Sequence, residues 1–240
     1  MKGSERHRLK ENELSHVLTD ATARLQENQR TFGLIGAAVA LVLVLGIGYW
    51  AWTTRSQNRA QAMLGDAIVV MQAPVEEPKA GAKPGVTSYP TVQARAEAAL
   101  SKFAEVYNAY PSTPAGIASR YYAASALSML GRHADAAARF QETVDRAGEN
   151  SFYGRMARLG VVEAHSQAKK YDEAITAAQA LVNNTTDDTI PRDALLMELG
   201  RVQAAAGKKA EAKQTLDKVI ADFPGSPYIE EAKRMLAELT

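Results

Sequence analysis

The feature that most constrains this chain is an uncharged run near its beginning, residues 31–54, with the sequence TFGLIGAAVALVLVLGIGYWAWTT. Arg30 and Arg55 bracket the run, and the part from Phe32 to Trp52 contains 21 residues. At about 1.5 Å rise per residue, an α-helix of that length crosses a hydrocarbon core of roughly 30 Å. Because a single span in lipid must satisfy its own backbone hydrogen bonds, the run predicts a transmembrane helix.

A cleaved signal peptide is the alternative interpretation of this run. The polar segment ahead of it is long, the apolar run exceeds the ~7 to 15 residues of a signal core, and bulky Tyr49 stands where cleavage needs a small residue. We therefore expect an uncleaved anchor. The basic residues of the short N-terminal tail, counted with its amino group, favour a cytoplasmic tail and a main part that is periplasmic or otherwise trans to the cytoplasm.

Composition argues against several classes of function. The whole chain has 28 Lys and Arg against 27 Asp and Glu, so no basic surplus is available to hold nucleic acid. It has no cysteine, which excludes disulfides, thiolate metal sites and a cysteine nucleophile. None of the four histidines lies three or four helical residues from another, and no catalytic motif occurs. We therefore predict no enzyme activity, no cofactor, no metal and no nucleic-acid partner.

The sequence divides the chain into four segments. They are a cytoplasmic tail with a short amphipathic helix (1–30), the transmembrane helix (31–54), a membrane-proximal helix followed by a Pro/Gly-rich loop (55–91), and a helical repeat domain (92–240). No helix-breaking residue separates the span from an apolar stripe that includes Ala60, Leu64 and Ala67, so the membrane helix is expected to continue into the third segment.

An internal repeat organises the last segment. Ala99, Ala136, Ala174 and Ala212 occupy equivalent positions, at spacings of 37, 38 and 38 residues. A fixed period of this size in an alanine-rich helical sequence predicts stacked helix pairs, an all-α solenoid of about four pairs. The residues around Tyr228 to Leu239 predict a C-terminal capping helix.

Other residues recur in phase with these alanines. Gly131 and Gly207 stand where one helix must turn into the next, while Lys169 occupies the corresponding place in the repeat between them. Further repeat-defining positions are the apolar Phe103 and Phe140, Gly200 on a first helix, and Pro224 at the end of a repeat.

These residues resemble the tetratricopeptide repeat, and Gly200, Gly207, Ala212 and Pro224 follow that motif best. The period is one turn longer than the usual ~34 residues. The whole layout also resembles a narrower family, the periplasmic ancillary subunit of the bacterial Sec translocon, whose domain is shared with a cell-division coordinator. That resemblance implies an inner-membrane protein with a chaperone-like role at the translocon exit, partnered with the translocon, folding factors or unfolded clients.

The first helices of such pairs line a groove, and we place them at residues 115–129, 153–168 and 191–205. The candidate protein-binding residues on them are Tyr121, Ser125, Leu159, Glu163, Met197 and Arg201. For Leu159 and Met197, the alternative to a place in the groove is ordinary packing in the core between helices. The leading hypothesis is a membrane-anchored scaffold that binds other proteins; the alternative is a self-associating structural component of an envelope or division complex.

Overall fold

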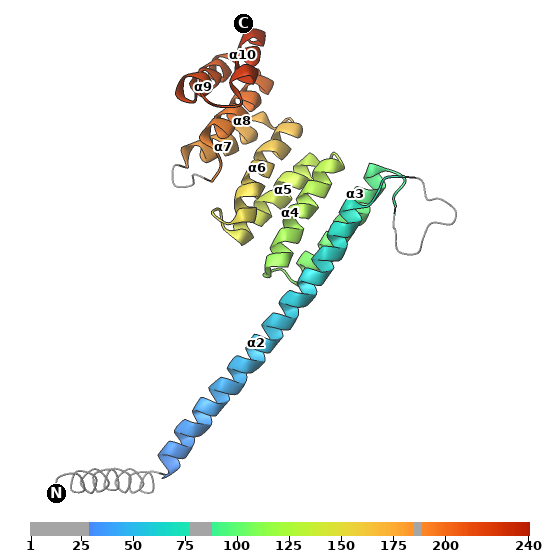
Figure 1. Ribbon diagram of the computed structural model, residues 1–240, viewed down its shortest axis with the longest axis vertical. Coiled ribbons are helices and arrows are strands. Elements are labelled where there is room, and N and C mark those ends of the chain that lie inside the picture. Colours follow the sequence, from blue (N-terminus) through green and yellow to red (C-terminus); the bar gives the residue numbers. More distant parts are fainter. Residues whose placement is uncertain (1–28, 77–87, 185–188) are drawn as a thin grey trace, which may run out of the picture. The chain divides into compact units, whose positions relative to one another are not determined.

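The computed structural model of the chain describes residues 29–76, 88–184 and 189–240, which are helical apart from turns and one isolated β-bridge (Figure 1). The predicted all-α class is therefore confirmed. The amphipathic helix expected in the tail and the middle of the Pro/Gly-rich loop lie outside the described residues. The chain divides into two compact units, Met1–Arg55 and Ser56–Thr240, each of which is described by itself.

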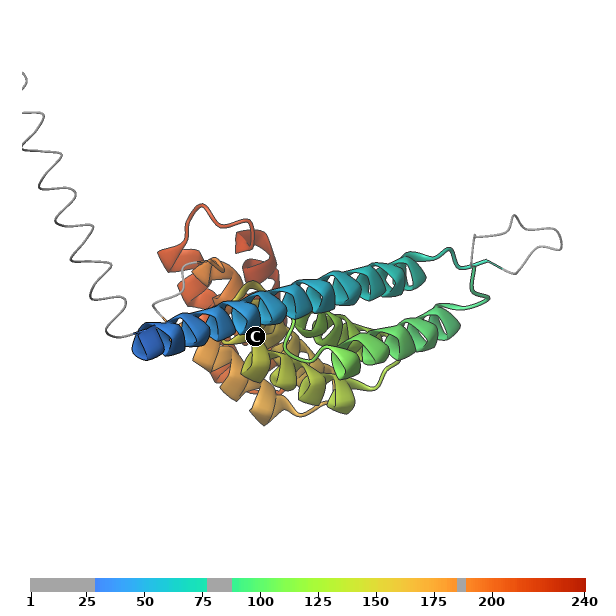
Figure 2. The ribbon, with the colours of Figure 1, turned by 90° about the horizontal axis from the view of Figure 1, so that it is seen from below.

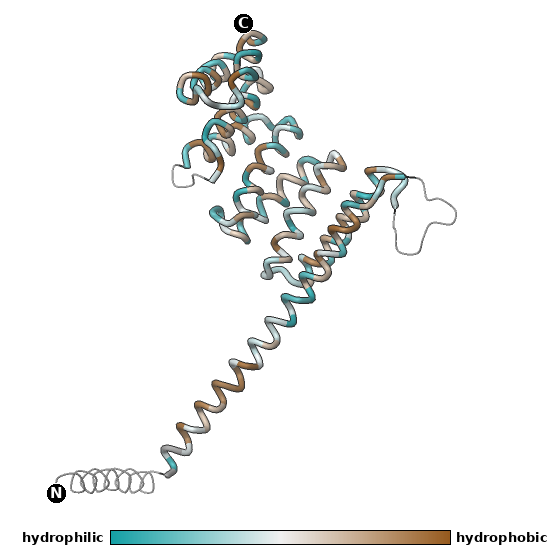
Figure 3. The backbone as a smooth tube through the Cα atoms, in the orientation of Figure 1, coloured by the Kyte–Doolittle hydropathy of each residue, from teal (hydrophilic) through white to brown (hydrophobic). Residues whose placement is uncertain are grey.

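One helix, α2 (Gln29–Gln72), contributes residues to both units. In the first unit it carries the uncharged run, whose large apolar side chains are exposed, and Figure 3 shows hydrophobic residues concentrated there. Its most apolar window has a mean hydropathy of 2.3 and no buried residue. By length and composition, α2 is the one described helix that is able to cross a membrane.

The second unit consists of helix pairs stacked in chain order (Figures 1 and 2). The end of α2 packs against α3 to form the first pair. The remaining helices are α3 (Val92–Ala109), α4 (Pro114–Met129), α5 (His133–Ala147), α6 (Phe152–Gln167), α7 (Tyr171–Asn183), α8 (Arg192–Ala205), α9 (Lys209–Asp222) and α10 (Ile229–Glu238). The starts and ends of α4, α6 and α8 lie within one residue of the predicted first helices.

The turns inside three pairs share one backbone conformation. Gly131, Lys169 and Gly207 have φ values of 71°, 59° and 74°, and they follow one another at 38-residue spacing. In each turn the next N–H donates to a carbonyl five residues back, as Arg132 does to Leu127 at 2.9 Å. This is the hydrogen bond of a Schellman helix end, which favours glycine. At the middle turn a lysine adopts the left-handed conformation, which costs about 1 to 2 kcal/mol for a residue with a Cβ atom.

Small residues let neighbouring helices approach closely. The repeat alanines at positions 99, 136, 174 and 212 are all completely buried. A Cβ atom on Gly160 of α6 would lie 2.7 Å from the ring of Phe140, and one on Gly200 of α8 would lie 2.8 Å from Leu216 Cδ2. The two glycines therefore make room for large side chains on the second helices.

The ends of the Pro/Gly-rich loop are held together. Tyr89 N donates to Pro74 O at 3.0 Å, and Glu76 N donates to Tyr89 O at 2.9 Å. These bonds form the isolated bridge between Val75 and Tyr89. The Arg95 side chain adds a bond from Nη1 to Ala73 O at 3.0 Å. The proline-rich sequence predicted no regular structure here, yet backbone pairing closes the base of the loop.

Candidate protein-binding surfaces

The predicted groove residues on α4 do not form a free polar surface. Tyr121 is half-buried against the ring of Phe140, with centroids 5.5 Å apart. Ser125 donates its hydroxyl hydrogen to Tyr121 O at 3.3 Å, within the same helix. Tyr121 therefore packs between helices, and the Ser125 hydroxyl is satisfied within its own helix.

Leu159 and Met197 pack in the hydrophobic core, which was the alternative to a place in the groove. Met197 is 0% exposed in an aliphatic cluster that also contains Leu216, and Leu159 packs against the same cluster. A side chain with no exposed surface cannot meet a partner, so the prediction of Met197 as a groove residue is wrong. The helical period of α8 gives its apolar face correctly, but it does not show that α10 and α9 cover that face completely.

Arg201 is already engaged within the chain. Its guanidinium makes two hydrogen bonds to the Glu231 carboxylate, at 3.0 and 2.9 Å, and a third to Glu198 at 3.2 Å. These bonds raise the pKa of Arg201. Because Glu231 belongs to α10, Arg201 ties the last helix to α8. Glu163 on α6 is exposed and accepts a hydrogen bond from Gln167 at 2.7 Å.

Aromatic rings from four helices gather around the start of α6. Tyr153 lies 5.6 Å from Tyr121 and 6.3 Å from Tyr122, measured between ring centroids. Tyr122 in turn stacks on Phe103 of α3 at 5.4 Å. Burial, with smaller contributions from Tyr122, raises the pKa of Tyr153 to about 12. The rings are therefore held in a largely apolar environment.

Two apolar side chains on α6 remain uncovered beside this cluster. Phe152 is 65% exposed and Met156, one helical turn later, is 36% exposed. The Phe152 ring lies 5.2 Å from Tyr153 and nearly perpendicular to it. We call Tyr121, Tyr122, Phe152, Tyr153 and Met156 the aromatic surface. Sequence reasoning missed Phe152 and Met156, although two apolar residues four apart in the first turns of a groove-lining helix were a visible signal.

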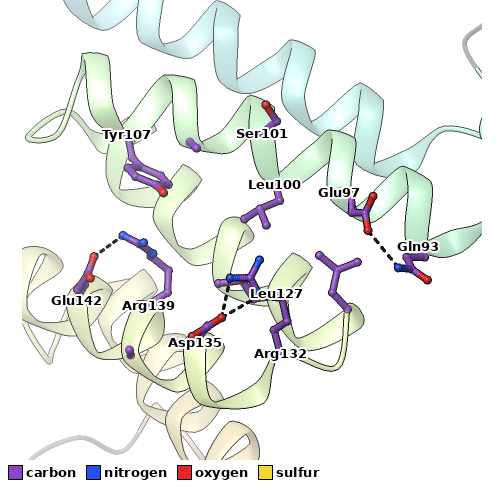
Figure 4. A pocket seen from close by; sticks show the side chains of 13 residues that line it. Gln93, Glu97, Leu100, Ser101, Tyr107, Leu127, Arg132, Asp135, Arg139 and Glu142 are labelled. Atoms are coloured by element: carbon purple, nitrogen blue, oxygen red, sulfur yellow. Dashed lines mark hydrogen bonds and ion pairs between the residues drawn. The ribbon is translucent and has the colours of Figure 1, made fainter.

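Apart from the aromatic surface, a depression of about 660 Å³ lies between α3 and α5, and we call it the α3–α5 groove (Figure 4). It is lined by Gln93, Glu97, Leu100, Ser101, Ala104, Tyr107, Leu127, Leu130, Arg132, Asp135, Ala138, Arg139 and Glu142. Arg132 donates to Asp135 from Nε at 2.8 Å, and Arg139 donates to Glu142 from Nη1 at 2.6 Å. Its walls combine apolar and charged groups.

Comparison with known families identifies the architecture of the helical part. Residues 96–226, more than half of the chain, match the family described as the tetratricopeptide repeat-like domain. The chain belongs to this family. No curated protein sequence matches the chain significantly.

Solved structures agree on the tetratricopeptide repeat-like fold. A crystal structure of a candidate kinesin light chain from Podosopora anserina, with nearly identical TPR-like repeats, has a TM-score of 0.55 and 17% identity, covering 76% of this chain and 86% of that one. A single-substitution variant of that protein gives the same TM-score and identity, with 76% and 85% covered. At this identity the likeness shows the fold alone.

Tetratricopeptide repeat-like domains are scaffolds for protein–protein interaction, and no enzymatic family is indicated for this chain. Among the residues that the structure describes, no three His, Cys, Asp or Glu side chains gather in a way that could hold a metal ion. The chemistry that remains is recognition by shape, apolar area and charge.

Proposed function

We propose that this chain is a membrane-anchored scaffold that binds apolar segments of other proteins on its aromatic surface. The observation that carries this proposal is the exposure of Phe152 and Met156 beside three half-buried tyrosines. Covering a Phe or Met side chain completely contributes about 1.5 to 3 kcal/mol. Aromatic rings that are already held in place lose little conformational entropy on binding, which suits them as anchors for a partner.

The rest of the proposal concerns where the scaffold works. The uncharged part of α2 serves as a single-pass anchor, with the N-terminal tail in the cytoplasm and the repeats in the periplasm of a bacterial inner membrane. Its length, its composition and its exposed apolar side chains support the anchor. The resemblance of the layout to the ancillary translocon subunit supports a chaperone-like role at the Sec exit, where unfolded apolar segments emerge.

Photo-crosslinking in membranes tests the binding surface. Phe152 is replaced by the photoreactive p-benzoylphenylalanine in the full chain, and the same amino acid is placed at exposed Lys233 on α10 as a matched control. We expect adducts with unfolded or translocating envelope proteins from position 152 and few from position 233. Equal adduct yields from both positions would exclude the aromatic surface as the binding site.

Adducts only between copies of this chain would instead support a self-associating envelope component. The anchor is tested separately, because the two parts of the proposal can fail independently. We expect the chain to stay in the membrane pellet after alkaline extraction, and its repeat domain to be digested by protease only when the outer side of the inner membrane is accessible. Release into the alkaline supernatant would exclude a spanning helix.

A further inference from the structure

A buried arginine lies behind one end of the α3–α5 groove. Arg120 of α4 is only 5% exposed, and its Nε and Nη1 atoms have no hydrogen-bond partner among the described residues. Its Nε lies 3.5 Å from Glu142 Oε2, and its guanidinium carbon lies 4.9 Å from the Tyr107 ring centroid. The ion pair with Glu142 leaves these two buried nitrogens without a hydrogen bond, which is unfavourable, so this end of the groove favours an added anion.

Charges near Arg120 do not balance. The Arg139 guanidinium also lies 4.9 Å from the Tyr107 ring, and both arginines share the single carboxylate of Glu142. Burial, and next the repulsion from nearby Arg146, lowers the pKa of Arg120. Two arginines against one carboxylate leave a positive excess at this end of the groove, where Arg139 and Glu142 belong to the wall (Figure 4) and Arg120 is buried.

The opposite end of the groove is negative. Glu97 accepts a hydrogen bond from the neutral Gln93 amide at 3.1 Å, and it makes no ion pair with a cation among the described residues. Apolar Leu100, Leu127 and Leu130 line the groove with these charged groups. Ten residues of α3 separate Glu97 from Tyr107, which corresponds to about 15 Å along the helix axis.

We propose that the α3–α5 groove binds an extended peptide segment of a partner protein, with a carboxylate side chain against Arg139, where buried Arg120 adds positive charge, and a basic side chain against Glu97. An extended chain advances about 3.3 Å per residue, so the acidic and basic residues should be about four positions apart, with apolar residues between them. This site goes beyond the proposed function, because it uses the second helices α3 and α5 and a charged partner segment.

The test uses the full chain in neutral detergent micelles and a probe peptide, fluorescein-Gly-Gly-Lys-Leu-Ala-Leu-Glu-NH2, whose label is attached to its N-terminus so that the Lys and Glu side chains stay charged. A second probe has the five residues after the glycines in reversed order. Binding of both probes is measured by fluorescence anisotropy, and the variants are tested with the probe that binds more tightly. We expect Arg139→Gln to weaken binding about tenfold, which corresponds to ~1.4 kcal/mol. We expect Arg234→Gln, a matched change of an exposed arginine on α10, to leave binding unchanged.

Glu142→Gln provides a change of opposite sign. This variant removes the carboxylate that competes for both arginines, so it should tighten binding several-fold, whereas mere damage to the fold would weaken it. A probe with Gln in place of its Glu should bind about tenfold more weakly. No binding at millimolar probe, or equal affinity of the Glu and Gln probes, would overturn the site.

The two proposals fail in different ways. With the photoreactive amino acid at position 152, Met156→Ser should weaken the crosslinks of the aromatic surface and leave probe binding in the α3–α5 groove unchanged. Arg139→Gln should do the reverse. A loss of both activities in either variant would show that the two surfaces are one site and would overturn the separate groove.

Discussion

The repeat domain has two halves that differ in their polar and aromatic side chains. We call α3 to α6 the aromatic half and α7 to α10 the aliphatic half. The buried side-chain nitrogen and oxygen atoms that lack hydrogen bonds in the described structure belong to Arg95, Ser119, Arg120, His133 and His165, and all lie in α3 to α6. In α7 to α10, buried polar groups are paired, as in the 2.7 Å hydrogen bond from Thr215 to Gln203.

The cores differ as well. Large rings occupy the interior and the surface of α3 to α6, whereas the interior of α7 to α10 is built from aliphatic side chains that α10 covers. Repeats of the same length therefore form two kinds of structure. In α7 to α10 the interior is covered and its polar groups are paired, whereas α3 to α6 have exposed rings and buried polar atoms without hydrogen bonds among the described residues. Both proposed binding surfaces lie where the repeat is packed with groups larger or more polar than its interior covers fully.

The largest effect should come from filling the two helix-contact glycines. Gly160→Ala places a Cβ atom within 2.8 Å of three ring atoms of Phe140, which cannot move aside, so we expect a loss of about 3 kcal/mol in the free energy of unfolding. Gly200→Ala meets the end of Leu216, which can rotate, and should cost about 1 kcal/mol. Urea unfolding measures both, and equal losses would contradict the expected difference between an aromatic and an aliphatic helix contact.

A smaller contrast is expected between two buried threonines. Thr215→Val leaves the buried Gln203 side chain without its partner, which should cost about 2 kcal/mol. Thr143→Val removes only a bond to Arg139 O within its own helix, and it should cost less than about 1 kcal/mol because the residue keeps its shape. The same unfolding measurement separates them. A larger loss at Thr143 would mean that the aromatic half depends more on polar pairing than its structure indicates.

The smallest effect is a pH dependence that Tyr153 of the aromatic half contributes. The folded state raises the pKa of Tyr153 from its ordinary 10.0 to about 12, so the folded chain holds this proton more strongly than the unfolded chain does. The stabilisation is present below pH 10 and is lost as pH rises toward 12. The melting temperatures of the native chain and of Tyr153→Phe should therefore converge or cross over this range. A constant difference between the two would contradict the buried phenol.

Sequence reasoning located the helices more accurately than the surfaces. The 38-residue phase identified Ala136, Ala174 and Ala212 as packing positions and Gly131 and Gly207 as turns, because these requirements are local to one repeat. It did not predict that Lys169 adopts the same left-handed turn as the glycines. The hydrogen bonds of the turn and the packing of its two helices hold that conformation despite its cost.

The candidate binding residues were harder to predict because exposure depends on neighbouring helices. Met197 and Phe152 both lie on first helices, yet one is completely buried and the other largely exposed. Periodicity defines the face of a helix, whereas coverage of that face is decided by residues far away in the chain, such as those of α10. The cluster of Arg120, Tyr107 and Arg139 joins three helices, so no local spacing revealed it.

The extent of α2 has a practical consequence for shortening the chain. Ala60, Leu64 and Ala67 are buried in the core that α3 completes, although they belong to the same helix as the uncharged run. Deleting the chain up to Gln72 would thus remove one wall of the first pair and uncover Phe103. A shortened chain that keeps the repeat domain intact should begin near Ser56, because the last turns of α2 are part of that domain.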